Sequence, residues 1–161
     1  MDGTTLIVRE VTSDSLEGQV LKVPVASVSF GGTQAPREEL REIGPSFVED
    51  VMVSQVVPPP TSKATGVLRF RKSLKKHFPK ELPAFIALEG YVVGHVLGHA
   101  LHRADTFDME SVIDALEETK ELDLCIGAIV SFGPSRHQAS NRVWAVGLRA
   151  EGDDVEIDLT H

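Results

Sequence analysis

Apolar residues recur at helical spacing through residues 83–103, whose sequence is PAFIALEGYVVGHVLGHALHR. One stripe along the helix consists of Phe85, Leu88, Val92 and Val96. A second set of apolar residues widens this stripe: Ile86, Val93, Leu97 and Ala100. Apolar side chains on so many sides of a helix are typical of a helix that is packed over most of its surface. The pattern therefore predicts that residues 83–103 form the most buried helix of the molecule.

Helices and strands alternate along the rest of the chain. Three further helices are predicted over residues 36–43, 62–78 and 108–122, the first opened by Pro36 and stopped by Gly44, the last capped by Asp108. Strands are predicted over residues 5–11, 25–30, 51–57, 124–132, 142–149 and 155–159, with the fourth and fifth forming a hairpin. The fold class is α/β. We expect a central mixed sheet from the strands near Val25, Val51, Leu124 and Val143, with helices packed on it.

Composition narrows the class of partner. The chain has 161 residues, 42% of them hydrophobic and 25% charged, which suits one ordinary core. Its formal net charge of −8 would repel nucleic acid, so no nucleic-acid partner is expected. Cys125 is the single cysteine, which excludes an internal disulfide framework and a cysteine-based metal site.

Five segments, taken in order, carry a resemblance to a known family. They read ASVSFGGTQ, VMVSQVVPPP, PAFIALEGYVVGHVLGHALHRAD, DMESVIDALEE and IVSFGPSRHQASNRVWAVGLRAEGDDVEI. In order and spacing they resemble the C-terminal part of the type I periplasmic solute-binding proteins of branched-chain amino acid ABC transporters. The resemblance covers residues 20–159, and its most specific parts are LEGY and the SFGP, HQ and RVW elements. Residues 1–19 are unassigned.

The resemblance implies a partial version of a fold in which two α/β lobes close on a small ligand. On that map residues 20–57 are second-lobe-like strands, the prolines at 58–60 mark a crossing between lobes, and residues 62–121 are first-lobe-like helices. Residues 124–159 return to the second lobe as a C-terminal β hairpin region. Complete members are much longer, so residues 1–161 are expected to be a single domain or a fragment, truncated relative to the family.

The resemblance also implies a ligand site. In members that bind amino acids, the loop after the strand matching residues 25–30 supplies an acidic side chain to the ligand's ammonium group, and Gln34 occupies that position here. An amide keeps the acceptor and loses the charge, which weakens the case for an α-amino acid over another small carboxylate. The expected ligand-binding residues are Phe30, Gly32, Thr33, Gln34, Glu89 and Tyr91.

Two other functions remain open at this point. His95, His99 and His102 share one side of the predicted helix, and two of them could bind one zinc ion in a zinc-dependent enzyme. The zincin motif, however, requires Glu directly after the first histidine, where this chain has Val96. The second alternative is a stand-alone oligomeric interaction module of unknown ligand.

The leading hypothesis is a truncated, non-catalytic relative of a solute-binding protein, with no catalytic residues, metal or cofactor. We expect a homodimer, because a chain that lacks part of its fold must cover apolar faces in another way. An ABC permease would be a partner only within a full-length protein. The family is periplasmic, but the start MDGTTLIV lacks the features of a secretory signal, so the chain as it stands is predicted to be cytoplasmic.

Overall fold

The computed structural model describes residues 25–28, 33–49, 51–152 and 154–157. The chain divides into two compact units, which we call the sheet unit and the helical unit. The sheet unit comprises residues 1–55 and 144–161, and the helical unit comprises residues 56–143. The chain enters the helical unit at Val56, two residues before the first of the three prolines, and leaves it after Val143.

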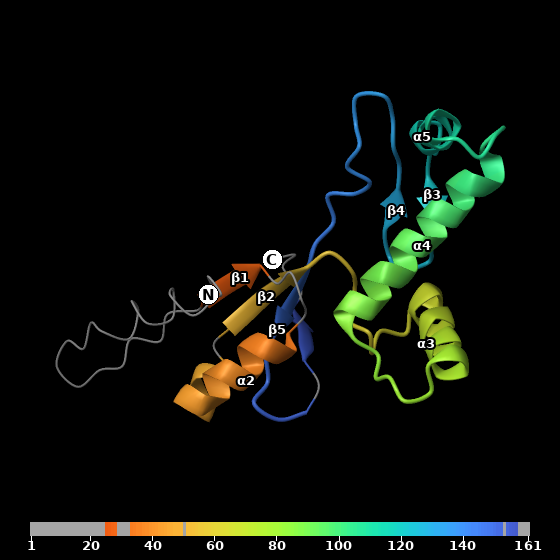
Figure 1. Cartoon of the computed structure of the whole chain (residues 1–161). Coiled ribbons are helices and arrows are strands. Elements are labelled where there is room, and N and C mark those ends of the chain that lie inside the picture. The colour runs from red at the N-terminus through yellow and green to blue at the C-terminus, as the bar shows by residue number, and fades with distance from the viewer. Residues whose placement is uncertain (1–24, 29–32, 50, 153, 158–161) are drawn as a thin grey trace. The chain divides into compact units, whose positions relative to one another are not determined.

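The sheet unit contains a mixed sheet, as the sequence predicts, although one predicted strand is replaced by another. Its strands are β1 (Val25–Val28), β2 (Val51–Gln55), β5 (Trp144–Gly147) and β6 (Val155–Ile157), in the order β1-β2-β5-β6. β1 and β2 run parallel, with Val28 opposite Ser54, whereas β5 is antiparallel to both of its neighbours. Helix α2 (Gln34–Ile43) and the short 3-10 helix η1 (Pro45–Phe47) connect β1 to β2 (Figure 1).

The core of the sheet unit lies between β2 and the elements that connect to it. Val51 and Val53 alternate along β2 with partly exposed residues, so their side chains share one face of the strand. The buried cluster consists of Leu40, Val48, Val51, Val53 and Leu148, with Phe47 and Ala150 packed against it. One apolar face of α2 and its following turn thus covers the sheet.

The helical unit contains three helices and a small sheet. The helices are α3 (Thr65–His77), α4 (Phe85–Arg103) and α5 (Met109–Glu117), and α4 contacts both of the others (Figure 1). Strands β3 (Leu122–Asp123) and β4 (Ile129–Val130) pair antiparallel. The predicted helices are confirmed, except that α5 ends at Glu117 and does not continue to residue 122, where β3 begins. The predicted cap of α5 is confirmed too, because Asp108 Oδ1 accepts a hydrogen bond of 2.8 Å from the Ser111 N–H.

The prediction that α4 is the most buried helix is wrong. Only Phe85, Leu88 and Ala100 are buried on it, whereas Ile86, Val93 and Leu97 are 54%, 60% and 47% exposed. Helices α3 and α5 pack against α4, and no described residue covers its remaining apolar side. Periodicity shows that a helix face is apolar, but it does not show whether the chain supplies a partner for that face.

The predicted strand over residues 124–132 is mostly a turn. Cys125 and Gly127 have left-handed backbone conformations, with φ of 58° and 86°, which interrupt extended structure. The short β4 that remains pairs with β3, and β5 pairs with β2 and β6. The predicted hairpin is therefore not formed, and the strand near Leu124 does not join the central sheet. The strand predicted over residues 5–11 lies outside the described residues.

Candidate functional site

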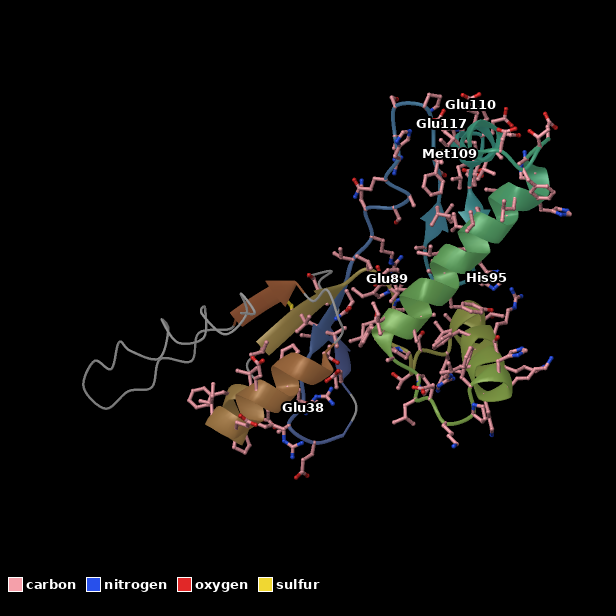
Figure 2. The ribbon with its side chains drawn as sticks, viewed as in Figure 1. Glu38, Glu89, His95, Met109, Glu110 and Glu117 are labelled. Carbon is pink, nitrogen blue, oxygen red and sulfur yellow. The ribbon has the colours of Figure 1, made fainter. Side chains whose placement is uncertain are left out.

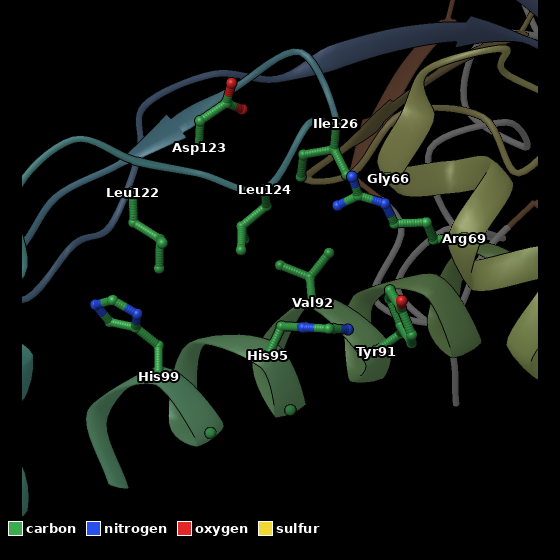
Figure 3. A pocket seen from close by; sticks show the side chains of 12 residues that line it. Gly66, Arg69, Tyr91, Val92, His95, His99, Leu122, Asp123, Leu124 and Ile126 are labelled. Carbon is green, nitrogen blue, oxygen red and sulfur yellow. The ribbon is translucent and has the colours of Figure 1, made fainter. Parts of the chain in front are cut away.

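A groove with a volume of about 570 Å³ lies within the helical unit (Figure 3). Helix α4, the start of α3 and the segment 122–126 line it. The lining residues are Gly66, Arg69, Tyr91, Val92, Gly94, His95, Gly98, His99, Leu122, Asp123, Leu124 and Ile126. This volume falls within the usual range of small-molecule pockets.

A close backbone contact builds one end of the groove. The Gly66 N–H donates to the Cys125 carbonyl at 2.8 Å, and a Cβ on Gly66 would lie 2.4 Å from the Leu124 carbonyl oxygen. The turn is held from within as well, because the Cys125 N–H donates to Asp123 Oδ1 at 2.7 Å. Glycine at position 66 therefore lets α3 begin directly against the turn that forms the opposite wall.

One side of the groove carries nitrogen donors. His95 and His99 stand one helical turn apart on α4 and both line the groove. Figure 3 shows the His99 imidazole directed toward Leu122, the His95 imidazole lying along α4 toward Tyr91, and the Arg69 guanidinium beside Ile126. The Tyr91 ring lies between the rings of Phe70 and His95, with centroid distances of 5.5 Å and 4.4 Å. The contact with Tyr91 orients the His95 imidazole.

The three histidines that share one side of α4 do not share one site. His95 and His99 line the groove, whereas His102 is exposed and does not. Over the described ranges, no three His, Cys, Asp or Glu side chains are grouped closely enough to hold a metal ion. The arrangement therefore supplies hydrogen-bond donors rather than the ligand set that a zinc site needs.

The predicted ligand residues fall in both units. Thr33 and Gln34 belong to the sheet unit, where Gln34 begins α2, and Glu89 and Tyr91 belong to α4. Phe30 and Gly32 lie outside the described residues. Figure 2 shows Glu89 and His95 on α4, and of the two only His95 lines the groove.

Thr33 is joined to an acidic residue that the sequence analysis did not single out. Its hydroxyl donates to Asp154, and Asp154 also forms an ion pair with Arg37. The Asp154 side chain is almost buried, at 8% exposure. Asp154 lies in the segment EGDD, whose composition indicates only a turn, so its buried pairing had no sequence signal beyond an acid beside a strand.

Gln55 is a second residue that the sequence analysis missed. It is 4% exposed at the carboxyl end of β2, and among the described residues its Nε2 has no hydrogen-bond partner. Because β1 and β2 are parallel, their carboxyl ends lie at the same edge of the sheet, and β1 there leads toward Thr33. The one available signal was a polar side chain at an alternating, inward position of an apolar strand.

Comparison with known proteins identifies the family. The family model described as "Periplasmic binding protein" matches residues 21–153. The chain belongs to this family. The confirmed mixed sheet and its helices are accordingly a partial type I periplasmic-binding-protein fold. No curated protein matches the sequence significantly.

Solved structures agree with the family model. The chain is similar to a possible leucine/isoleucine/valine-binding protein from Rhodopirellula baltica SH 1, with 29% identity, a TM-score of 0.71, and coverage of 83% of this chain and 35% of that one. A leucine binding protein LivK from Thermotoga maritima MSB8 gives 24% identity, a TM-score of 0.57, and coverage of 74% and 33%. A fatty acid ABC transporter substrate-binding protein from Thermomonospora curvata has 17% identity and a TM-score of 0.67, and the match covers 86% of this chain and 36% of that one.

The chain spans about a third of the length of these solved structures. The family consists of periplasmic solute-binding proteins rather than enzymes. Of the described helices, none combines the length and apolarity needed to cross a membrane. The start of the chain lies outside the described residues. The cytoplasmic location of the protein therefore stays a prediction.

Proposed function

We propose that this chain is a shortened solute-binding protein that holds a small carboxylate-bearing solute weakly and performs no chemistry on it. The observation that carries the proposal is Gln55, a buried amide at the carboxyl edge of two parallel strands, whose Nε2 is unpaired among the described residues. Ligands of open α/β sheets bind beyond the carboxyl ends of the strands. An unpaired buried donor there favours a ligand that brings an acceptor.

The pairing of the buried acid of the sheet unit favours a carboxylate oxygen over an ammonium group as the recognised part of the ligand. Asp154 accepts from both Thr33 and Arg37, so its charge is already compensated. The Gln55 amide donates to a carboxylate without a compensating charge, which gives modest affinity. The proposed ligand contacts from the family resemblance remain Phe30, Gly32, Thr33, Gln34, Glu89 and Tyr91.

The names of the relatives support the same ligand class. Leucine, named for one relative, and a fatty acid, named for another, share a carboxylate attached to an apolar chain. A chain that spans about a third of such proteins offers fewer contacts than they do, so its affinity should be lower. Any ABC permease partner would require the rest of a full-length protein.

Ligand-observed NMR tests the ligand class. The purified chain is screened against leucine, valine, butyrate and the matched amide butyramide. We expect saturation transfer to the carboxylates and a weaker response from butyramide. A folded chain that gives no saturable response with any of these solutes contradicts the proposal.

A homodimer is the second part of the proposal. Six exposed residues form a continuous apolar surface along α4, which we call the α4 stripe: Ile86, Gly90, Val93, Gly94, Leu97 and Leu101. The stripe has no charged side chain, although the chain as a whole carries −8, so two copies can meet here without like charges in contact. Gly90 and Gly94 have nothing within 4 Å of an added Cβ, which allows a second helix to approach closely.

A further inference from the structure

We propose that the groove of the helical unit is a separate binding site for a small organic anion with an apolar chain. The groove uses Arg69, His95 and His99, none of which belongs to the solute site proposed above. Tyr91 lines the groove and is also a family-based candidate contact of that site, and we assign it no contact with the anion. Its argument does not depend on Gln55 or on the edge of the sheet. The two proposals can therefore fail independently.

Three nitrogen donors face the groove from two helices. Arg69 on α3 carries a permanent charge and five N–H donors, and each imidazole of α4 donates from a ring nitrogen in either charge state. Within the described part of the chain, neither Arg69 nor His99 has a side-chain hydrogen bond or an ion pair. An anion would supply the acceptors that these donors lack.

The carboxylate nearest the groove does not cancel this preference. Asp123 is the acidic residue among the described lining residues, and its Oδ1 already accepts the Cys125 N–H. Figure 3 shows its carboxylate directed away from α4. In a chain of net charge −8, a groove lined by Arg69 and two imidazoles is a local site of anion attraction.

The opposite wall determines the shape of the ligand. Leu122, Leu124 and Ile126 give the groove an apolar wall that faces the donors, and Val92 adds an apolar side chain from α4. A volume of about 570 Å³ is far larger than the ~30 Å³ that one water molecule occupies in the liquid, so a bare inorganic ion would leave it mostly filled with water. An anion with a short alkyl chain would contact both walls.

Hexanoate is the probe for this site, with hexanamide as its uncharged match. We expect hexanoate to move the imidazole NMR signals of His95 and His99 in a saturable way, with a dissociation constant on the order of 1 mM. Hexanamide should bind about tenfold more weakly, because it lacks the charge-assisted hydrogen bonds. Variants His95→Gln and His99→Gln assign the two signals among the six histidines.

Arg69→Met decides the role of the guanidinium. This substitution should weaken hexanoate binding about tenfold, and Arg69→Lys should restore part of the loss. The control is Lys75→Met, which lies on the same helix but outside the groove and should bind hexanoate as the parent does. Thermal unfolding of each variant confirms that the fold is kept. Hexanoate that fails to saturate the histidine shifts, or Arg69→Met that binds as well as the parent, would overturn the proposal. Gln55→Leu should leave the shifts unchanged, and their loss in that variant would show that the groove is not a separate site.

Discussion

Among the described glycines, Gly66 has the least room for a side chain. An added Cβ would lie 2.4 Å from the Leu124 carbonyl oxygen and 2.9 Å from that of Cys125. We expect Gly66→Ala to separate α3 from the turn and to lower the free energy of unfolding by about 1–3 kcal/mol. Chemical denaturation measures the change.

The matched control for this substitution is Gly98→Ala. Gly98 lies inside α4 and outside the α4 stripe, with nothing within 4 Å of an added Cβ, so alanine there should raise stability by about 0.5–1 kcal/mol through helix propensity. The opposite signs of the two changes are the prediction. Equal effects at both positions would mean that the contact between Gly66 and the turn contributes nothing.

Asp154 connects the start of α2 to the last part of the sheet unit. Asp154→Ala would remove the acceptor of both Thr33 and Arg37, leaving two donors without their partner in a mostly buried place. We expect a loss of about 1–3 kcal/mol in the free energy of unfolding, measured by urea titration. Asp154→Asn keeps an acceptor and should lose less. An alanine variant as stable as the parent would show that the cluster is not structural.

The residues that could not be predicted are those whose roles arise from distant partners. The sequence indicates an inward Gln55 only as an exception to alternation, and Asp154 only as a turn residue. Thr33 and Asp154 are 121 positions apart, a separation over which no local pattern carries information. Asp108 was predictable because its partner, the Ser111 N–H, lies three residues ahead in the same helix.

At the scale of elements, Asp108 makes the start of α5 sensitive to acid. The hydrogen bond from the Ser111 N–H, followed by that from the Thr106 hydroxyl, lowers the pKa of Asp108 below its ordinary value of 3.8. A lowered pKa in the folded state means that the stabilisation is fully present above pH 3.8 and is lost as the pH falls through the lowered pKa. We therefore expect Asp108→Ala to lower the melting temperature at pH 6.

The pH dependence separates this effect from a loss of packing. As the pH falls below 3.8, the melting temperatures of the parent and of Asp108→Ala should converge, because protonation weakens the cap in the parent. Calorimetric scans between pH 6 and the lowest pH at which the parent stays folded give the comparison. A constant difference over that range would contradict the assigned role.

Helices were more predictable than strands in this chain, for a physical reason. The pattern that predicts α3, α4 and α5 is local, since a helix forms its hydrogen bonds within one segment. A strand requires a partner elsewhere, and the apolar run 124–132 contains two left-handed residues that prevent an extended strand of that length. Pairing of β4 with β3 rather than β5 depends on that turn.

At the scale of the whole molecule, the order and spacing of five sequence segments predicted the family and the fold class. They did not predict that one side of α4 is exposed. The α4 stripe is a continuous apolar surface, which is usually buried, yet its residues are exposed in the described part of the chain. We propose that a second copy of the chain covers it. We expect sedimentation at micromolar concentration to give a dimer, and Val93→Asp or Leu97→Asp to give a folded monomer.

Position-matched controls make the dimer prediction specific. His102→Asp adds the same charge to an exposed site of α4 outside the stripe and should remain dimeric, whereas Leu88→Asp buries a charge in the helical unit and should unfold it. A parent chain that sediments as a monomer would contradict the homodimer. A dimer that persists in both stripe variants would place its interface elsewhere.

The central claim is that the chain binds a carboxylate-bearing solute at the edge of its sheet. Calorimetric titration of the parent and of Gln55→Leu tests this claim most directly. The titrant is the best carboxylate from the NMR screen. We predict saturable binding weaker than about 1 µM in the parent, because the chain spans about a third of the length of its relatives. Gln55→Leu should lose at least about tenfold in affinity and should be as stable as the parent. Unchanged affinity in a folded Gln55→Leu variant, or no binding by the parent, would contradict the account.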